Sequence, residues 1–175
     1  MGRYRIVLAD DHALIRHGLK RIIEENTDMD VVGEAGDGLE LLELLNFLHP
    51  HMVVLDISMP KLRGIEAIGE LKRKYPDVKV LVLSMHKEYV FQALSAGSDG
   101  YLLKEDASRE FFLAIDRISQ GGKYLSQSLG ELVAERLSDK NIEPVSEPLS
   151  AREREILRLI ADGNTNRQIA QIFSI

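Results

Sequence analysis

The chain of 175 residues is long enough for one complete domain and a small second one, and its 45% hydrophobic and 29% charged residues are typical of a globular protein. It has no cysteine, which excludes disulfides and thiolate metal sites, and its first apolar run is too short for a signal peptide or a membrane span, so we expect a cytoplasmic protein with no membrane partner. The net charge is −6, and residues 149–175 hold four arginines against three acidic residues, so the negative excess lies before them and argues against nucleic-acid binding there.

Apolar segments of strand length alternate with segments of helical period over the first 120 residues. The predicted strands are residues 5–9, 30–35, 52–55, 78–83 and 101–103, and the predicted helices are residues 12–26, 38–48, 64–74, 87–96 and 108–120. Four strands are continuously apolar, as in a parallel sheet covered on both faces, and the second contains acidic residues, as an edge strand can. This order predicts an α/β fold, a doubly wound (βα)5 domain with the flavodoxin-like strand order 2-1-3-4-5.

The remaining residues are predicted to form a linker and part of a second, all-α domain. A helix is expected from about residue 126 to 137, and a polar, proline-containing stretch follows it up to residue 148. Two capping boxes, which begin at Ser150 and Thr165, open two helices joined by a glycine-containing turn, as in the first part of a helix-turn-helix. We therefore expect three parts: a first domain at 1–122, a linker with a helix at 123–148, and an incomplete helical domain at 149–175.

Polar residues stand where the predicted strands end. Asp10 and Asp11 follow the first strand, Asp56 follows the third, and Ser84 and Lys104 follow the fourth and fifth. In an open α/β sheet a ligand binds at this end, where the strand order reverses, which is here between strands one and three. Three carboxylates that meet there need a cation, and an oxygen-liganded ion such as Mg²⁺ suits them. A lysine and a hydroxyl group nearby suit a phosphoryl group.

Each of these residues also has an ordinary structural interpretation. The acidic pair could cap a helix, Asp56 could end a strand in a turn, and Ser84 and Lys104 could be surface residues. The conjunction of five such residues at one end of four strands favours the site for Mg²⁺ and a phosphoryl group.

At these residues the chain resembles the receiver domain of bacterial two-component response regulators. The resemblance runs from Arg3 to about Gly121 and includes Met59-Pro60 and Gly64. It implies that Asp56 is the phosphoacceptor and that a sensor histidine kinase supplies the phosphoryl group. It also implies that Asp11, Asp56 and the backbone carbonyl of Ser58 hold Mg²⁺, with Asp10 acting through water.

The resemblance also implies a switch. Phosphate on Asp56 would draw the hydroxyl of Ser84 inward, and Tyr101 would fill the space that Ser84 leaves. The alternative for Tyr101 is a half-buried strand aromatic that packs on the fourth helix. The family often has a cis-proline after the lysine, but here Glu105 follows Lys104, so the geometry of this loop is open.

The tail, from Leu149 to Gly163 and from Thr165 to Phe173, resembles the first half of the LuxR-type DNA-binding domain. Together with a receiver this indicates the NarL/FixJ subgroup of transcription regulators. The recognition helix would begin after Ile175, so the DNA-binding residues are unknown, and we expect DNA as a partner of a longer protein only. The alternative is a helical pair with a packing role, and the sequence also allows a homodimer.

Two other functions compete with a transcription regulator. A phosphatase of the haloacid dehalogenase type uses a similar set of residues but needs a second aspartate two positions after the nucleophile, where this chain has Ser58. We therefore expect no enzyme that turns over a substrate. A stand-alone phosphorelay or protein-interaction switch is the other alternative.

Overall fold

The computed structural model describes residues 2–130 and 132. Its strands are β1 (Tyr4–Ala9), β2 (Met29–Ala35), β3 (Met52–Leu55), β4 (Lys79–Ser84), β5 (Gly100–Leu103) and β6 (Tyr124–Leu125). Its helices are α1 (Ala13–Glu24), α2 (Gly38–Leu45), α3 (Gly64–Lys74), α4 (Val90–Ser95) and α5 (Ala107–Ser119), and a short 3₁₀ helix, η1 (Gln127–Leu129), follows β6.

All strand pairs are parallel, and their order is β2-β1-β3-β4-β5-β6. This confirms the predicted order 2-1-3-4-5 and adds a sixth strand that was not predicted. β2 lies at one edge of the sheet, and its Glu34 forms ion pairs with Arg16 and Lys20 of α1. This pairing explains why an acidic residue is tolerated in a strand of this sheet.

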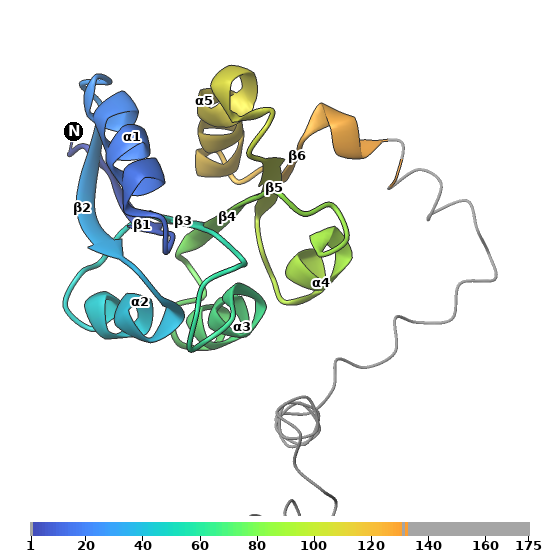
Figure 1. The fold of residues 1–175 in the computed structure, drawn as a ribbon. Coiled ribbons are helices and arrows are strands. Elements are labelled where there is room, and N and C mark those ends of the chain that lie inside the picture. The colour runs from blue at the N-terminus through green and yellow to red at the C-terminus, as the bar shows by residue number, and fades with distance from the viewer. Residues whose placement is uncertain (1, 131, 133–175) are drawn as a thin grey trace, which may run out of the picture. The chain divides into compact units, whose positions relative to one another are not determined.

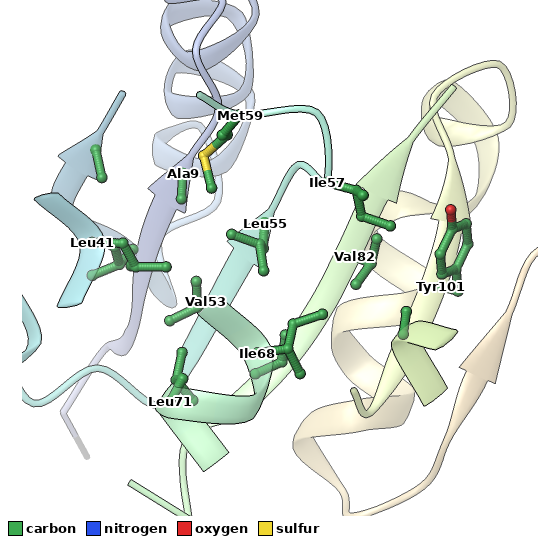
Figure 2. Packing of buried hydrophobic residues seen from close by; sticks show 14 of the residues in the cluster. Ala9, Leu41, Val53, Leu55, Ile57, Met59, Ile68, Leu71, Val82 and Tyr101 are labelled. Atoms are coloured by element: carbon green, nitrogen blue, oxygen red, sulfur yellow. The ribbon is translucent and has the colours of Figure 1, made fainter. Parts of the chain in front are cut away.

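Two apolar layers fill the space between the sheet and its helices. Successive side chains of the central strands point to opposite faces: Val7 and Val53 join the layer under α2, α3 and α4, whereas Ile6 and Val54 join the layer under α1 and α5. Figure 1 shows the same division of the helices between the two faces, and Figure 2 shows the packing of the first layer. Both faces are covered, which is why the central strands are continuously apolar.

The sixth strand attaches the residues that follow α5 to β5. The backbone N–H of Ser126 donates to the carbonyl of Tyr101 at 3.0 Å, and its hydroxyl accepts from the N–H of Leu103 at 2.8 Å. The hydroxyl of Tyr124 donates to Glu110 of α5 at 2.8 Å, and Leu129 is fully buried in the first apolar layer. Residues 124–129 therefore belong to the packed domain.

Several element bounds differ from the predicted ones. α4 begins at Val90 and not at residue 87, because residues 87–89 form a bend and a turn and Tyr89 makes no side-chain cap at the helix start. The helix predicted from about residue 126 begins instead as η1, and Gly130 and Leu132 are helical. The rest of this helix, the linker to residue 148 and the two predicted helices at 149–175 lie outside the described residues.

Candidate functional site

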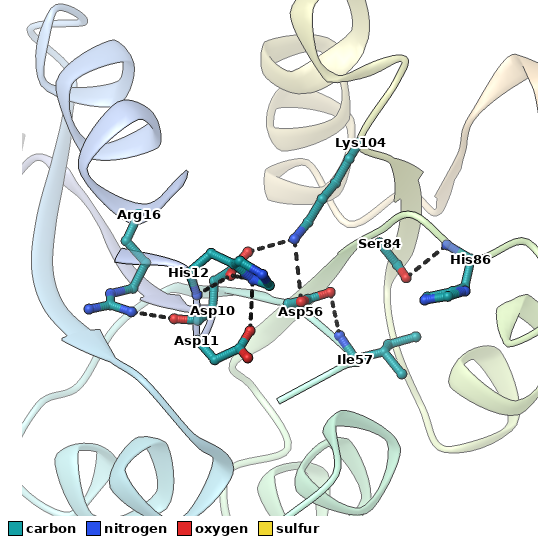
Figure 3. A network of polar contacts seen from close by, with 9 residues as sticks. All are labelled: Asp10, Asp11, His12, Arg16, Asp56, Ile57, Ser84, His86 and Lys104. Atoms are coloured by element: carbon teal, nitrogen blue, oxygen red, sulfur yellow. Dashed lines mark hydrogen bonds and ion pairs between the residues drawn. The ribbon is translucent and has the colours of Figure 1, made fainter. Parts of the chain in front are cut away.

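The structure brings the predicted polar residues together at the carboxyl ends of the strands. β1 ends at Ala9 just before the acidic pair, and β3 ends at Leu55 just before Asp56. β1 and β3 are neighbours, so Asp10 and Asp56 lie side by side. Figure 3 shows Lys104 reaching toward them from the end of β5, and Ser84 at the end of β4. The strand order thus gathers groups that are up to 94 residues apart in the sequence.

Lys104 links the two most buried carboxylates. Its Nζ lies 2.8 Å from an oxygen of Asp10 and 3.3 Å from an oxygen of Asp56. The side chain of Lys104 is 12% exposed, and those of Asp10 and Asp56 are 5% and 3% exposed. One ammonium group is thus shared between two carboxylates that water barely reaches. Two negative charges face one positive charge, so the net charge of this group is negative and favours the binding of a second cation.

The pKa of Asp56 reflects its burial and the excess of negative over positive charge around it. Burial raises the pKa of Asp56, the negative charge of Asp10 raises it further, and the charge of Lys104 opposes both. The backbone N–H of Ile57 donates to Asp56 Oδ1 at 2.8 Å. These contacts leave the pKa above its usual value, so the ionised carboxylate is less well stabilised than in water.

His12 joins the acidic pair, which the sequence analysis did not foresee. Its Nδ1 lies 2.9 Å from Asp11 Oδ1 and 3.2 Å from Asp10 Oδ1, and its backbone N–H donates to the same oxygen of Asp10 at 2.8 Å. Ligand atoms of Asp10, Asp11, His12 and Asp56 all lie within 4.8 Å of one another. The only sequence signal for His12 was its position next to the acidic pair.

Arg16 is a second residue that the sequence analysis missed. From the second turn of α1 its Nη1 donates to the backbone carbonyl of Asp10 (Figure 3), and its Nε lies 3.6 Å from Glu34 of β2. Lys20 holds the other oxygen of Glu34 at 2.9 Å, and this hydrogen bond lowers the pKa of Glu34. Glu34 thus orients Arg16, and Arg16 fixes the backbone of the loop that carries the acidic pair.

The loop after β3 is held close to the start of α3. The N–H of Gly64 donates to the carbonyl of Ile57 at 3.1 Å, and a Cβ atom on Gly64 would lie 2.5 Å from Ile57 Cα and 2.6 Å from the carbonyl oxygen of Asp56. Only glycine allows this approach. Ser58 is exposed in the same loop, and Lys61 has a positive φ of 64° and pairs with Asp37 at 2.5 Å.

Ser84 and Tyr101 both contact the loop that follows β4. Ser84 is fully buried and its hydroxyl accepts from the N–H of His86 at 3.1 Å, while the hydroxyl of Tyr101 donates to the carbonyl of His86. Burial raises the pKa of Tyr101 to about 12. Tyr101 is fully buried here and not half-buried, as the alternative interpretation of this residue had it. The peptide bond between Lys104 and Glu105 is trans.

Two family models match this chain. Residues 6–116 match the response regulator receiver domain, and residues 147–175 match the bacterial regulatory proteins of the luxR family. The first match covers more than half of the chain, and the chain therefore belongs to the response regulators. More narrowly, it is a two-component response regulator of the NarL/FixJ type, a transcription regulator in which a receiver domain precedes a LuxR-type DNA-binding domain. This confirms the class inferred from the sequence motifs.

Characterised relatives match nearly the whole chain. DegU from Brevibacillus brevis, a transcriptional regulatory protein, is 37% identical and covers 99% of this chain and 81% of its own length. The nitrate/nitrite response regulator NarL from Escherichia coli is 37% identical, over 97% of this chain and 81% of its own. The oxygen regulatory protein NreC from Staphylococcus epidermidis is 37% identical, and the match covers 95% of this chain and 81% of NreC.

Solved structures of response regulators are similar to this chain. A LuxR-family response regulator from Aurantimonas has a TM-score of 0.74 at 32% identity and covers 78% of this chain and 99% of its own. RcsB from Salmonella enterica, bound to a promoter in the presence of the phosphomimetic BeF3−, has a TM-score of 0.72 at 28% identity. The match covers 99% of this chain and 84% of the RcsB chain. Among the described residues of the present chain, no helix is long and apolar enough to cross a membrane.

Proposed function

We propose that Asp56 is the phosphoacceptor of this response regulator and that a sensor histidine kinase supplies the phosphoryl group. The observation that carries this proposal is the place of Asp56: it is buried at the end of β3, between the acidic pair of the β1 loop and the ammonium group of Lys104. A carboxylate oxygen of Asp56 would attack phosphorus, the bond from phosphorus to the kinase histidine would break, and an acyl phosphate would form on Asp56.

The donor set fits Mg²⁺. Three carboxylates with hard oxygen atoms face a space to which Lys104 contributes a single positive charge. We assign Asp11, Asp56 and the backbone carbonyl of Ser58 as direct ligands, and Asp10 as a ligand through water. A bound Mg²⁺ would supply positive charge to offset the charge that collects when a phosphoryl group meets these carboxylates. Arg16 and Glu34 would hold the β1 loop in place for this purpose.

Lys104 and Ser84 would bind the phosphoryl oxygens. Lys104 is already 3.3 Å from Asp56, and the hydroxyl of Ser84, which accepts a hydrogen bond here, would be drawn toward the phosphoryl group and donate its proton to it. This would change its contact with His86, to which the buried Tyr101 is also bound. Ser84 and Tyr101 are thus the switch residues of the proposal, and the loop after β4 reports the state of Asp56.

The output of this switch would be DNA binding. We propose that the receiver, expected at 1–122, extends through the packed residues 124–129, that a linker then leads to residue 148, and that the LuxR-type domain begins at 149. The receiver would control how that domain, as a monomer or a homodimer, binds a promoter. In this scheme the chain passes on a signal and turns over no external substrate.

Labelling of Asp56 tests the proposal. Acetyl phosphate or a phosphorylated kinase should label the chain only when Mg²⁺ is present, Asp56→Asn should abolish the label, and Asp11→Asn should raise the Mg²⁺ concentration that labelling requires. Asp77→Asn is the matched control, because Asp77 is exposed before the opposite end of β4, and it should label as the native chain does. Undiminished labelling of Asp56→Asn would overturn the assignment.

A further inference from the structure

We infer that His12 is a nitrogen ligand of the proposed metal site and that this site accepts divalent first-row transition ions such as Ni²⁺ and Co²⁺ as well as Mg²⁺. The inference rests on the proposed function, since it adds a donor to the same pocket. His12 is not among the ligands proposed above, which are Asp11, Asp56, the carbonyl of Ser58 and, through water, Asp10.

The geometry places the imidazole among the carboxylates. Nδ1 of His12 is 2.9 Å from Asp11 and 3.2 Å from Asp10, and one atom from each of these residues and from Asp56 falls within 4.8 Å of the others. Such a spread lets one ion touch all four donors after small side-chain rotations, because bonds from transition ions to imidazole nitrogen and carboxylate oxygen are about 2.0–2.2 Å long.

The backbone of His12 is fixed, while its ring is largely exposed and pairs only with the acidic residues that would share the ion. The N–H of His12 donates to Asp10 Oδ1 at 2.8 Å, and Arg16 holds the carbonyl of Asp10, so the loop that positions the ring is braced on both sides of the peptide. The side chain of His12 is 61% exposed and makes no side-chain cap at the start of α1. The ring can therefore turn toward an ion without leaving a cavity or uncapping the helix.

The chemistry of the donors decides which ions gain from His12. Mg²⁺ prefers oxygen and keeps several waters, so an imidazole adds little to its binding. Imidazole suits Zn²⁺, Ni²⁺, Cu²⁺ and iron, and affinity for a mixed nitrogen and oxygen site rises along the series from Mn²⁺ to Cu²⁺. Three carboxylates alone would favour a hard ion, and the addition of His12 moves the preference toward softer ions.

Metal titration of the full chain, free of any histidine tag, tests this inference. Calorimetry with Ni²⁺ and with Mg²⁺ should be run on the native chain, on His12→Ala and on His17→Ala. His17 is the matched control, because it is an exposed histidine of α1 outside the cluster. We expect His12→Ala to lower the ratio of Ni²⁺ affinity to Mg²⁺ affinity by at least tenfold, and His17→Ala to leave the ratio unchanged.

A second readout reports the ligand atom directly. The visible absorption of bound Co²⁺ should change on His12→Ala, because a nitrogen donor is lost, and should be the same for His17→Ala as for the native chain. An unchanged affinity ratio together with an unchanged Co²⁺ spectrum in His12→Ala overturns the inference. The proposed function fails by a different result, persistent labelling of Asp56→Asn, so that the two failures can be told apart.

Discussion

Replacing Lys72 by methionine should destabilise the domain far more than an ordinary surface change. Lys72 of α3 lies at the amino ends of the strands, where its Nζ is 2.6 Å from Asp99 and 2.7 Å from the carbonyl of Val78. The two side chains are only 17% and 11% exposed. Burial acts to raise the pKa of Asp99, but the hydrogen bonds from Lys72 and from the N–H of Val80, with the charges of Lys72 and Lys123, together lower it.

The expected loss of stability depends on the partners that Asp99 retains after Lys72 is replaced. Removing one partner of a buried ion pair costs about 3–5 kcal/mol when the other charge is left alone. Asp99 retains the N–H of Val80 at 2.9 Å and the ammonium group of Lys123 at 3.3 Å. Because these two partners remain, the loss at Asp99 should be about 2 kcal/mol, which is below the range for a buried charge left alone. The unpaired carbonyl of Val78 adds about 1 kcal/mol, for a total near 3 kcal/mol.

Urea unfolding followed by far-UV circular dichroism measures this cost, since the chain has no tryptophan for fluorescence. Arg73→Met is the matched control: Arg73 is the next residue, pairs with Glu70 at 2.5 Å with both side chains well exposed, and should cost at most about 0.5 kcal/mol. The folded pKa of Asp99 lies below its unfolded value, so the stability from this pair is present above about pH 4 and is lost as the pH falls further. The difference between Lys72→Met and the native chain should shrink accordingly. Equal costs for the two substitutions, or a difference independent of pH, would refute this reasoning.

Three further predictions concern the site and the segment after α5. Without Mg²⁺, Asp56→Asn should raise the thermal midpoint by a few degrees, because it removes a buried carboxylate whose pKa is raised, and the gain should diminish as the pH falls toward 4; a lower midpoint would contradict the electrostatic argument. We expect Ser58 and His86 to flank the path by which water would reach the proposed acyl phosphate, so alanine at either position should change the rate of label loss severalfold. An unchanged rate would make both ordinary loop residues. Leu129→Ala should cost about 2–4 kcal/mol in urea unfolding because Leu129 is fully buried, whereas the exposed Leu14→Ala should cost little; similar costs would mean that η1 is not docked.

The sequence predicted the central elements most accurately. β3 and α3 have the predicted bounds, because β3 is a buried apolar run that ends at a polar residue, and α3 runs from a glycine to the turn before Pro76. β6 could not be predicted, since its two residues become a strand only by pairing with β5. The start of α4 was placed too early because its first residues carry a helical pattern without a cap.

The sequence predicted those site residues whose positions are set by the order of the strands. The acidic pair, Asp56 and Lys104 stand at strand ends, so the strand order alone brings them together. His12, just before α1, and Arg16, within it, both contact Asp10, and these contacts depend on the direction in which the helix leaves the β1 loop. The full burial of Tyr101 likewise depends on the packing between β5 and α4, and no sequence pattern specifies it.

The docked segment after α5 determines where the polypeptide leaves the receiver. Ser126 is bound to the backbone of β5 at Leu103, one residue before Lys104, so the segment holds in place the end of the strand that the proposed phosphate-binding lysine follows. If residues 124–129 were released from the sheet, six residues, or about 20 Å of extended chain, would no longer be held by the receiver. A few hydrogen bonds and one buried leucine therefore set the point at which the chain leaves the packed receiver.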